Sequence, residues 1–223
     1  MSESRFAAVV LFDLDGTLVD SAVDLLNALN VIAEREGREP LPLAAIRPVV
    51  SKGARAMLAV AFPDRDEATR NALVPAFLAA YEASVATHST PFAGIDAVLD
   101  AIETAGSRWG IVTNKPYYLA KAVIASMQWS ERCQVLIGGD TLPRKKPDPD
   151  QLLLACDALG VVAGDCVYVG DDERDIIAAQ RAGMKSVAAL WGYREAHEDP
   201  RAWHPDVLVD APADLLRVGV LQR

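Results

Sequence analysis

Residues 11–18, which read LFDLDGTL, decide the fold because they end an apolar segment with two carboxylates and a glycine. The segment from Ala7 to Phe12 is apolar at every position, which is typical of a strand that is buried on both faces of a parallel sheet. Asp13 and Asp15 therefore follow the carboxyl end of this strand, where open α/β sheets bind their ligands. The sequence thus predicts a ligand site built around these two acids.

Two carboxylates at one sheet edge repel each other, and a hard cation such as Mg²⁺ relieves that repulsion. One of the two can then act as a nucleophile toward phosphorus while the other carries a proton. Gly16 and Thr17 would offer backbone donors and a hydroxyl to the transferred group. A hairpin turn at Asp15-Gly16 is the alternative interpretation, but the residues after Leu18 run into a helical pattern instead of a partner strand.

The composition excludes several classes of partner. The chain has 223 residues, of which 51% are hydrophobic and 24% charged, which is typical of a globular protein with one large domain or a core domain and an insert. Its net charge of −9 disfavours binding to nucleic acid or to anionic lipid. No apolar run is long enough to cross a bilayer. We therefore expect a small-molecule partner, with no nucleic acid and no membrane.

The termini and cysteines indicate a cytoplasmic protein. Residues 1–5 are polar in character and lead directly into the first strand, so no secretory signal is predicted. Cys133, Cys156 and Cys166 lack the paired spacing of a disulfide scaffold or a metal knuckle. We expect all three to be reduced thiols.

The pattern of elements predicts an α/β fold with a helical insertion. Residues 21–88 show helical patterns only, with breaks near Gly37 and Ser51 and a helix over 66–86 that is kinked or begins afresh at Pro75. Afterwards helices alternate with strands, which implies right-handed crossovers and a doubly wound parallel sheet. We therefore expect a core domain of residues 1–20 and 89–223 and a helical cap domain of residues 21–88. The expected later strands cover residues 109–113, 134–137, 166–169, 186–190 and 207–209.

Chemically useful groups follow three of these later strands. Residues 113–115 (TNK) place a hydroxyl, an amide and a cation at a helix start, which favours an anion. Residues 145–149 (KKPDP) hold lysines beside two prolines, and residues 170–175 (GDDERD) suit an oxygen-ligated cation. Each motif alone has an ordinary explanation as a helix cap or a solvated charge cluster. Together with residues 11–18 they predict one phosphate and metal site.

These four motifs resemble, in order and over nearly the whole chain, those of the haloacid-dehalogenase superfamily of phosphatases. The resemblance implies that Asp13 is the nucleophile and that Asp15 is first the general acid and then the general base. It implies that Mg²⁺ is held by the side chains of Asp13 and Asp171 and by the backbone carbonyl of Asp15. An acid at position 15 also favours phosphoryl transfer over dehalogenation, which needs no leaving-group acid there.

The resemblance also implies which residues bind the phosphoryl group. Thr113 and Lys146 would bind its oxygens with Asn114 beside them, and Asp172 or Asp175 would support the metal and the lysine. Two other functions stay open: a sugar phosphomutase, which would return the phosphoryl group to the sugar, and a non-catalytic phosphate-binding regulator. The regulator would be expected to lack the nucleophile, the acid or the lysine, and all three are present.

The predicted cap carries the information about the substrate. Lys52, Gly53 and Arg55 place two cations and free backbone donors at a helix start, which suits a second anion such as a carboxylate; a solvent-exposed helix start is the alternative. The chain is similar to bacterial phosphoglycolate phosphatases in its cap placement and in residues 137–140 and 191–193. Residues 50–57 are more similar to N-acetylmuramic acid 6-phosphate phosphatases of peptidoglycan recycling. We expect N-acetylmuramic acid 6-phosphate as the substrate, with 2-phosphoglycolate as the alternative.

Overall fold

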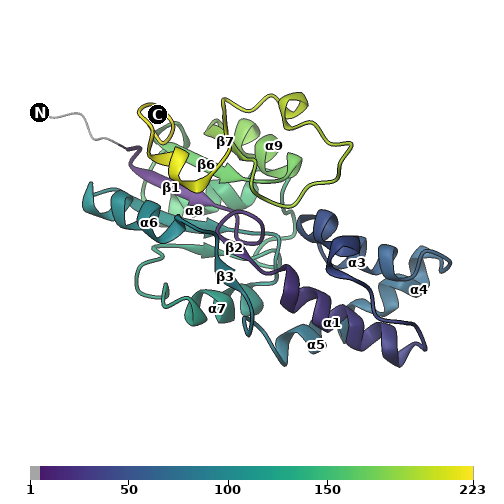
Figure 1. Cartoon of the computed structure of the whole chain (residues 1–223). Coiled ribbons are helices and arrows are strands. Elements are labelled where there is room, and N and C mark those ends of the chain that lie inside the picture. The colour runs from purple at the N-terminus through teal and green to yellow at the C-terminus, as the bar shows by residue number, and fades with distance from the viewer. Residues whose placement is uncertain (1–5, 223) are drawn as a thin grey trace, which may run out of the picture.

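The computed structural model describes residues 6–222, so residues 1–5 and 223 of the expected core lie outside the described residues. Within the described residues, six parallel strands form one sheet in the order β5-β4-β1-β6-β7-β8 (Figure 1). The first strand of the chain is therefore central in the sheet. The strands are β1 (Val9–Phe12), β4 (Arg108–Val112), β5 (Leu136–Ile137), β6 (Cys166–Gly170), β7 (Lys185–Ala189) and β8 (Val207–Val209).

Helices cover both faces of this sheet. Val10 and Phe12 of β1 pack in the cluster that holds α6 (Ile95–Thr104) and α7 (Tyr117–Ser126). Val9 and Leu11 pack on the opposite face with α8 (Asp150–Leu159) and α9 (Glu173–Ala182). This alternation explains the continuous apolar run in the sequence, because every β1 side chain faces a helix layer. The predicted doubly wound parallel sheet is confirmed.

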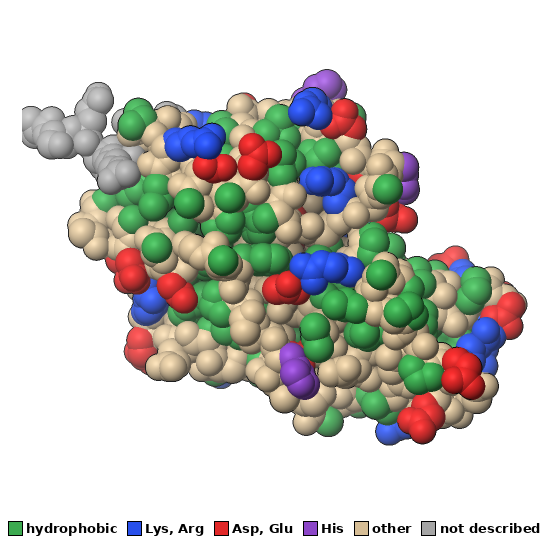
Figure 2. Space-filling model, viewed as in Figure 1, with side chains coloured by type: hydrophobic (Ala, Val, Ile, Leu, Met, Phe, Trp, Pro, Cys, Tyr) green, Lys and Arg blue, Asp and Glu red, His purple; other side chains and the backbone are tan. Residues whose placement is uncertain are grey.

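The remaining helices form a separate block between β1 and β4. In Figure 1 they lie to one side of the sheet, and in Figure 2 they form the lobe at lower right. Their apolar faces share a cluster of their own, to which Leu119 and Tyr193 also contribute. The block consists of α1 (Ala22–Arg35), α2 (Leu43–Ile46), η1 (Arg47–Lys52), α3 (Ala54–Ala61), α4 (Glu67–Ala72) and α5 (Val74–Glu82). The cap limits of 21 and 88 stay a prediction.

Two short strands connect the helical block to the sheet. β2 (Val19–Asp20) and β3 (Thr90–Pro91) pair in antiparallel fashion, so the chain enters and leaves the block at one place. The sequence did not reveal this pair, because strands of two residues have no hydrophobic period. Asp15-Gly16 does not join two paired strands, since β1 pairs only with β4 and β6.

The expected helix over residues 66–86 is divided in two. α4 ends at Ala72 and α5 begins at Val74, with Pro75 in its first turn, where a missing N–H costs no hydrogen bond. Short 3₁₀ turns complete the core: η2 (Ala163–Asp165), η3 (Pro200–Trp203) and η4 (Pro212–Leu216). In the described part of the chain, none of the helices has both the length and the apolar character that crossing a membrane requires.

Packing in the helical block gives a first prediction. Leu29 of α1 is fully buried in the block's cluster, whereas Val31 of the same helix is 39% exposed. Leu29→Ala should lower the free energy of unfolding by about 2–5 kcal/mol, because it removes buried methyl groups and leaves a cavity. Val31→Ala should change it by no more than about 0.5 kcal/mol. Urea denaturation of both variants checks this, and equal losses would contradict the assigned packing.

Candidate active site

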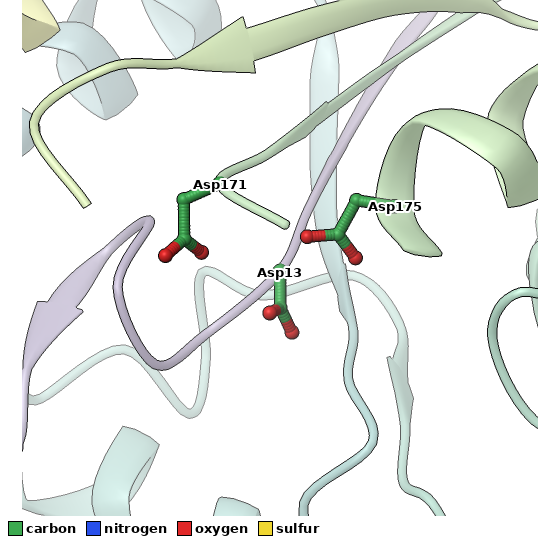
Figure 3. Close-up of side chains that lie close together, drawn as sticks. All are labelled: Asp13, Asp171 and Asp175. Atoms are coloured by element: carbon green, nitrogen blue, oxygen red, sulfur yellow. The ribbon is translucent and has the colours of Figure 1, made fainter. Parts of the chain in front are cut away.

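Three buried carboxylates meet at the carboxyl edge of the sheet. Asp13 follows β1, Asp171 follows the neighbouring strand β6, and Asp175 lies in the first turn of α9 (Figure 3). One oxygen of each carboxylate lies within 4.8 Å of the others. The cluster exists because adjacent parallel strands end at the same edge and α9 begins directly after β6. The family resemblance implied Asp13 and Asp171 as metal ligands and Asp172 or Asp175 as support for the metal and the lysine, and these roles stay predictions.

Lys146 is the cation beside this cluster. Its Nζ lies 3.0 Å from Asp13 Oδ1 and donates hydrogen bonds of 2.7 Å to Asp175 Oδ1 and to the Tyr168 hydroxyl. Burial alone would lower the pKa of Lys146, but the carboxylates of Asp13 and Asp175 raise it, so the ammonium stays charged. The lysine thus touches the expected nucleophile from a fixed position.

The charges at this edge do not balance. Burial, and then Asp13 and Asp175, raise the pKa of Asp171 well above its usual range. Burial likewise raises the pKa of Asp175 to about 6, although Lys146 lowers it. Three carboxylates beside one ammonium leave excess negative charge in a buried place, which a divalent cation with oxygen ligands would neutralise. The donor set therefore fits a hard metal ion.

Asp171 is oriented by groups from three parts of the chain. The Thr17 hydroxyl donates to Oδ1 at 3.0 Å, and the Ser51 hydroxyl and Tyr193 N–H donate to Oδ2 at 2.7 and 2.9 Å. The Thr17 hydroxyl thus bonds the acid in this arrangement, and its expected contact with a phosphoryl group stays a prediction. Ser51 belongs to η1 of the helical block, so the block reaches the acidic cluster directly.

The backbone of Gly16 passes so close to Asp171 that no other residue fits. A Cβ at Gly16 would lie 2.2 Å from Asp171 Oδ2, and φ there is +89°. Gly37 also has a positive φ of +72°, but a Cβ there would meet nothing within 4 Å. Both glycines therefore have a backbone conformation that would strain another residue. A Cβ would collide with Asp171 at Gly16 and would meet no atom at Gly37.

This difference gives a second prediction. Both Gly16→Ala and Gly37→Ala should lose about 1–2 kcal/mol of stability from the left-handed backbone. Only Gly16→Ala should also lower kcat, by about a hundredfold, because it displaces Asp171. Phosphatase assays and thermal melts of both variants measure these effects, and full activity in Gly16→Ala would contradict the role given to Asp171.

A third prediction concerns metal binding and pH. Because burial raises the pKa of Asp171 and Asp175, protons compete with a cation for them at low pH. In the metal-free protein, the stability linked to the raised pKa of Asp175 is present at low pH and lost as pH rises through about 6, and that linked to Asp171 is lost in the same direction. The rise in Tm caused by MgCl₂ should therefore grow between about pH 5 and pH 8. Equal Tm shifts at both pH values, or a shift that persists in Asp171→Asn, would contradict this.

Asp15 lies beside the cluster and is held by two residues. The Ser21 hydroxyl donates to Oδ1 at 2.5 Å, and Lys115 Nζ donates to Oδ1 and Oδ2 at 3.1 and 3.0 Å. Lys115 is buried, and its ammonium also lies 4.3 Å from the centroid of the Tyr81 ring. Only the position of Lys115 at a strand end drew attention to it in the sequence, and nothing there indicated that Ser21 contacts Asp15.

Thr113 and Asn114 lie where β4 ends. Thr113 is buried and its hydroxyl accepts a hydrogen bond of 3.2 Å from the backbone N–H of Lys115. The Asn114 amide donates to the Lys146 carbonyl at 3.0 Å, and its Oδ1 accepts no hydrogen bond from the described residues. Both side chains are thus beside Asp13 and Lys146 along the sheet edge, and their contact with a phosphoryl group stays a prediction.

Ion pairs join the helical block to the sheet edge. Lys52 Nζ lies 2.9 Å from Asp172 Oδ2 and 2.5 Å from Glu198 Oε1. Arg174 lies 2.7 Å from Asp172 Oδ1 and also donates to the Ser51 carbonyl. In this arrangement the Lys52 ammonium binds two carboxylates of the chain itself. Its expected contact with a substrate anion stays a prediction.

A cavity of about 270 Å³ lies between the helical block and this edge. Its polar end holds the expected catalytic acids and several cations, and its other wall is apolar. The lining includes Asp13, Asp15, Ser51, Lys52, Gly53, Arg55, Thr113, Asn114, Lys115, Lys145 and Arg174, together with Leu25, Met57, Val74, Phe77, Leu78 and Tyr81. The residues expected to bind the leaving group therefore share one cavity with the nucleophile.

The sequence matches the haloacid dehalogenase-like hydrolases over residues 10–189. The chain belongs to this family. It is 57% identical to a phosphoglycolate phosphatase of Xanthomonas campestris pv. campestris (strain 8004), over 95% of this chain and 96% of that protein. It is 41% identical to an N-acetylmuramic acid 6-phosphate phosphatase of Pseudomonas aeruginosa, over 98% and 96%. The crystal structure of a predicted phosphoglycolate phosphatase from Haemophilus somnus 129PT superposes with a TM-score of 0.85 at 25% identity, covering 96% and 98%.

These relatives confirm the family and the expected enzyme class, a phosphatase of the haloacid-dehalogenase type. Residues 50–57 are more similar to the N-acetylmuramic acid 6-phosphate phosphatases. Over nearly the whole chain, however, the identity to the phosphoglycolate phosphatase is higher.

Proposed function

We propose that the protein is a magnesium-dependent phosphomonoesterase that works through an aspartyl-phosphate on Asp13. The proposal depends above all on the contact between Asp13, which lines the cavity, and the buried Lys146 behind it, 3.0 Å between Oδ1 and Nζ. A carboxylate nucleophile needs a fixed cation that also neutralises the transferred group. Lys146 is held for that purpose by Asp175 and Tyr168.

The acidic cluster would hold the metal. Asp13 and Asp171 would bind Mg²⁺ with their side chains and Asp15 with its backbone carbonyl, while Asp175 and Asp172 keep the lysine and the loop in place. When bound, Mg²⁺ supplies positive charge against the transferring phosphoryl oxygens. All other roles in the proposed reaction are assigned to side chains of the protein.

The reaction follows from the positions of the two acids. Asp13 attacks phosphorus while the bond to the leaving oxygen breaks, and protonated Asp15 gives its proton to that oxygen. Asp15 then takes a proton from water, whose oxygen attacks the aspartyl-phosphate and releases inorganic phosphate and free Asp13. Thr113 and Lys146 bind the phosphoryl oxygens in both steps. The helical cap limits access of bulk water to the intermediate.

As substrate we propose a phosphate ester with a second, carboxylate group, and 2-phosphoglycolate first. The sequence of the cap loop favoured N-acetylmuramic acid 6-phosphate, but the 57% identity to a phosphoglycolate phosphatase supports the two-carbon acid more strongly than 41% supports the sugar. Both compounds carry the carboxylate that residues of the cavity mouth could bind.

One observation favours the muramic sugar as a second candidate. The cavity of about 270 Å³ has an apolar wall built by α5, including Val74, Phe77 and Leu78. 2-Phosphoglycolate has no apolar group large enough to cover this wall. N-acetylmuramic acid 6-phosphate has two methyl groups, one acetyl and one lactyl, that can pack against it. Selectivity between the two esters therefore has to be measured.

A fourth prediction tests the chemistry. Asp13→Asn should lower kcat by about a thousandfold or more for every ester, because it removes the nucleophile. Asp157→Asn, at an exposed position of α8, should behave as wild type. Phosphate release is measured with MgCl₂ from 2-phosphoglycolate and from N-acetylmuramic acid 6-phosphate in parallel. Turnover that survives in folded Asp13→Asn would overturn the mechanism.

The same assay separates the remaining functions. A hundredfold preference in kcat/KM, which corresponds to about 2.7 kcal/mol, assigns the substrate. Isomerised sugar without free phosphate would indicate a phosphomutase, and no turnover of any phosphate ester would indicate a phosphate-binding regulator.

A further inference from the structure

The cations that line the cavity are not all neutralised. Lys115 pairs with Asp15, Lys52 with Asp172 and Glu198, and Arg174 with Asp172. Among residues 6–222, the side chains of the two remaining cations of the lining, Arg55 and Lys145, make neither an ion pair nor a hydrogen bond. Two positive charges therefore stay uncompensated in the cavity of a protein whose net charge is −9.

These two cations of the cavity lining come from different parts of the protein. Arg55 lies in the first turn of α3 in the helical block, and Lys145 lies in the core loop that precedes Lys146. Burial, and then the positive charges of Arg55 and Arg174, lower the pKa of Lys145. The two positive charges repel each other. An anion bound between them would attract both and offset that repulsion. Both side chains are exposed, so a ligand can reach them.

We propose that Arg55 and Lys145 together bind the second anionic group of the substrate, a carboxylate, and that Lys145 is a specificity-determining residue. The sequence had assigned this anion to Lys52 and Arg55 of the cap, but Lys52 is occupied by Asp172 and Glu198. The inference rests on the proposed phosphatase function. This inference adds that the core recognises the carboxylate through Lys145, as the cap does through Arg55. A bound carboxylate would therefore hold the cap and the core together.

The test uses two pairs of substrates in which one member lacks the carboxylate. Ethyl phosphate has a methyl group in place of the carboxylate of 2-phosphoglycolate, and N-acetylglucosamine 6-phosphate lacks the whole lactyl group of N-acetylmuramic acid 6-phosphate. Lys145→Met should lower kcat/KM about tenfold for the carboxylate member of the pair that the enzyme uses, and less than about twofold for the other member. Lys145→Arg should restore most of the loss. Lys121→Met, at an exposed lysine outside the cavity lining, is the matched control and should change neither value.

Thermal melts exclude a folding defect as the cause. Because Lys145 has no carboxylate partner among the described residues, Lys145→Met should leave Tm unchanged or raise it. A loss of kcat/KM together with an unchanged Tm is the signature of a recognition residue.

The outcomes also separate this inference from the proposed function. If wild type prefers the carboxylate substrates and Lys145→Met keeps that preference, the inference is wrong and the proposed function stands. If Lys145→Met slows both members of a pair equally, Lys145 does not recognise the carboxylate. If wild type hydrolyses phosphate esters without preferring the carboxylate members, both the inference and the proposed substrate class fail, while the phosphatase chemistry remains. If Asp13→Asn and wild type are equally inactive on all four esters, the proposed function fails.

Discussion

Repulsion among the three buried carboxylates at the ends of β1 and β6 is the constraint on which the rest of the site depends. Asp13, Asp171 and Asp175 share a space in which burial already disfavours charge. Lys146 offsets part of that charge, and the hydroxyls and N–H groups around Asp171 offset more. The remaining negative charge fits a hard metal ion, as in the proposed function, and without one it costs local stability.

The helical block takes part in this balance. Ser51 bonds Asp171, while Lys52 neutralises Asp172 and Glu198. The block is joined to the core by two adjacent strands, β2 and β3, and these polar contacts fix the position in which it meets the core. The hydroxyl of Ser51 thereby connects the helical block to the acidic cluster directly.

The sequence predicted those parts of the fold and site that follow from local pattern. The apolar run before Asp13 predicted a strand buried on both faces of a parallel sheet, and the polar groups after later strands predicted that Lys146 and Asp171 lie near its end. Contacts across the block and core escaped prediction, because Ser51 and Asp171 are 120 residues apart and their meeting depends on how two packed units face each other. Lys115 beside Asp15 escaped because the two residues are 100 apart in the chain and meet only through the order of β1 and β4 in the sheet. Lys52 was assigned to the substrate because its carboxylate partners could not be foreseen.

The central place of β1 also determines when the protein can fold during its synthesis. β1 is made first, yet both of its neighbours, β4 (Arg108–Val112) and β6 (Cys166–Gly170), are made after the whole helical block. The block has its own apolar cluster and can condense in the meantime, whereas β1 carries unpaired backbone groups and an exposed apolar run until its neighbours leave the ribosome. Such a strand is prone to aggregate, so the segment that leads to the proposed nucleophile is also one that needs protection in a nascent chain.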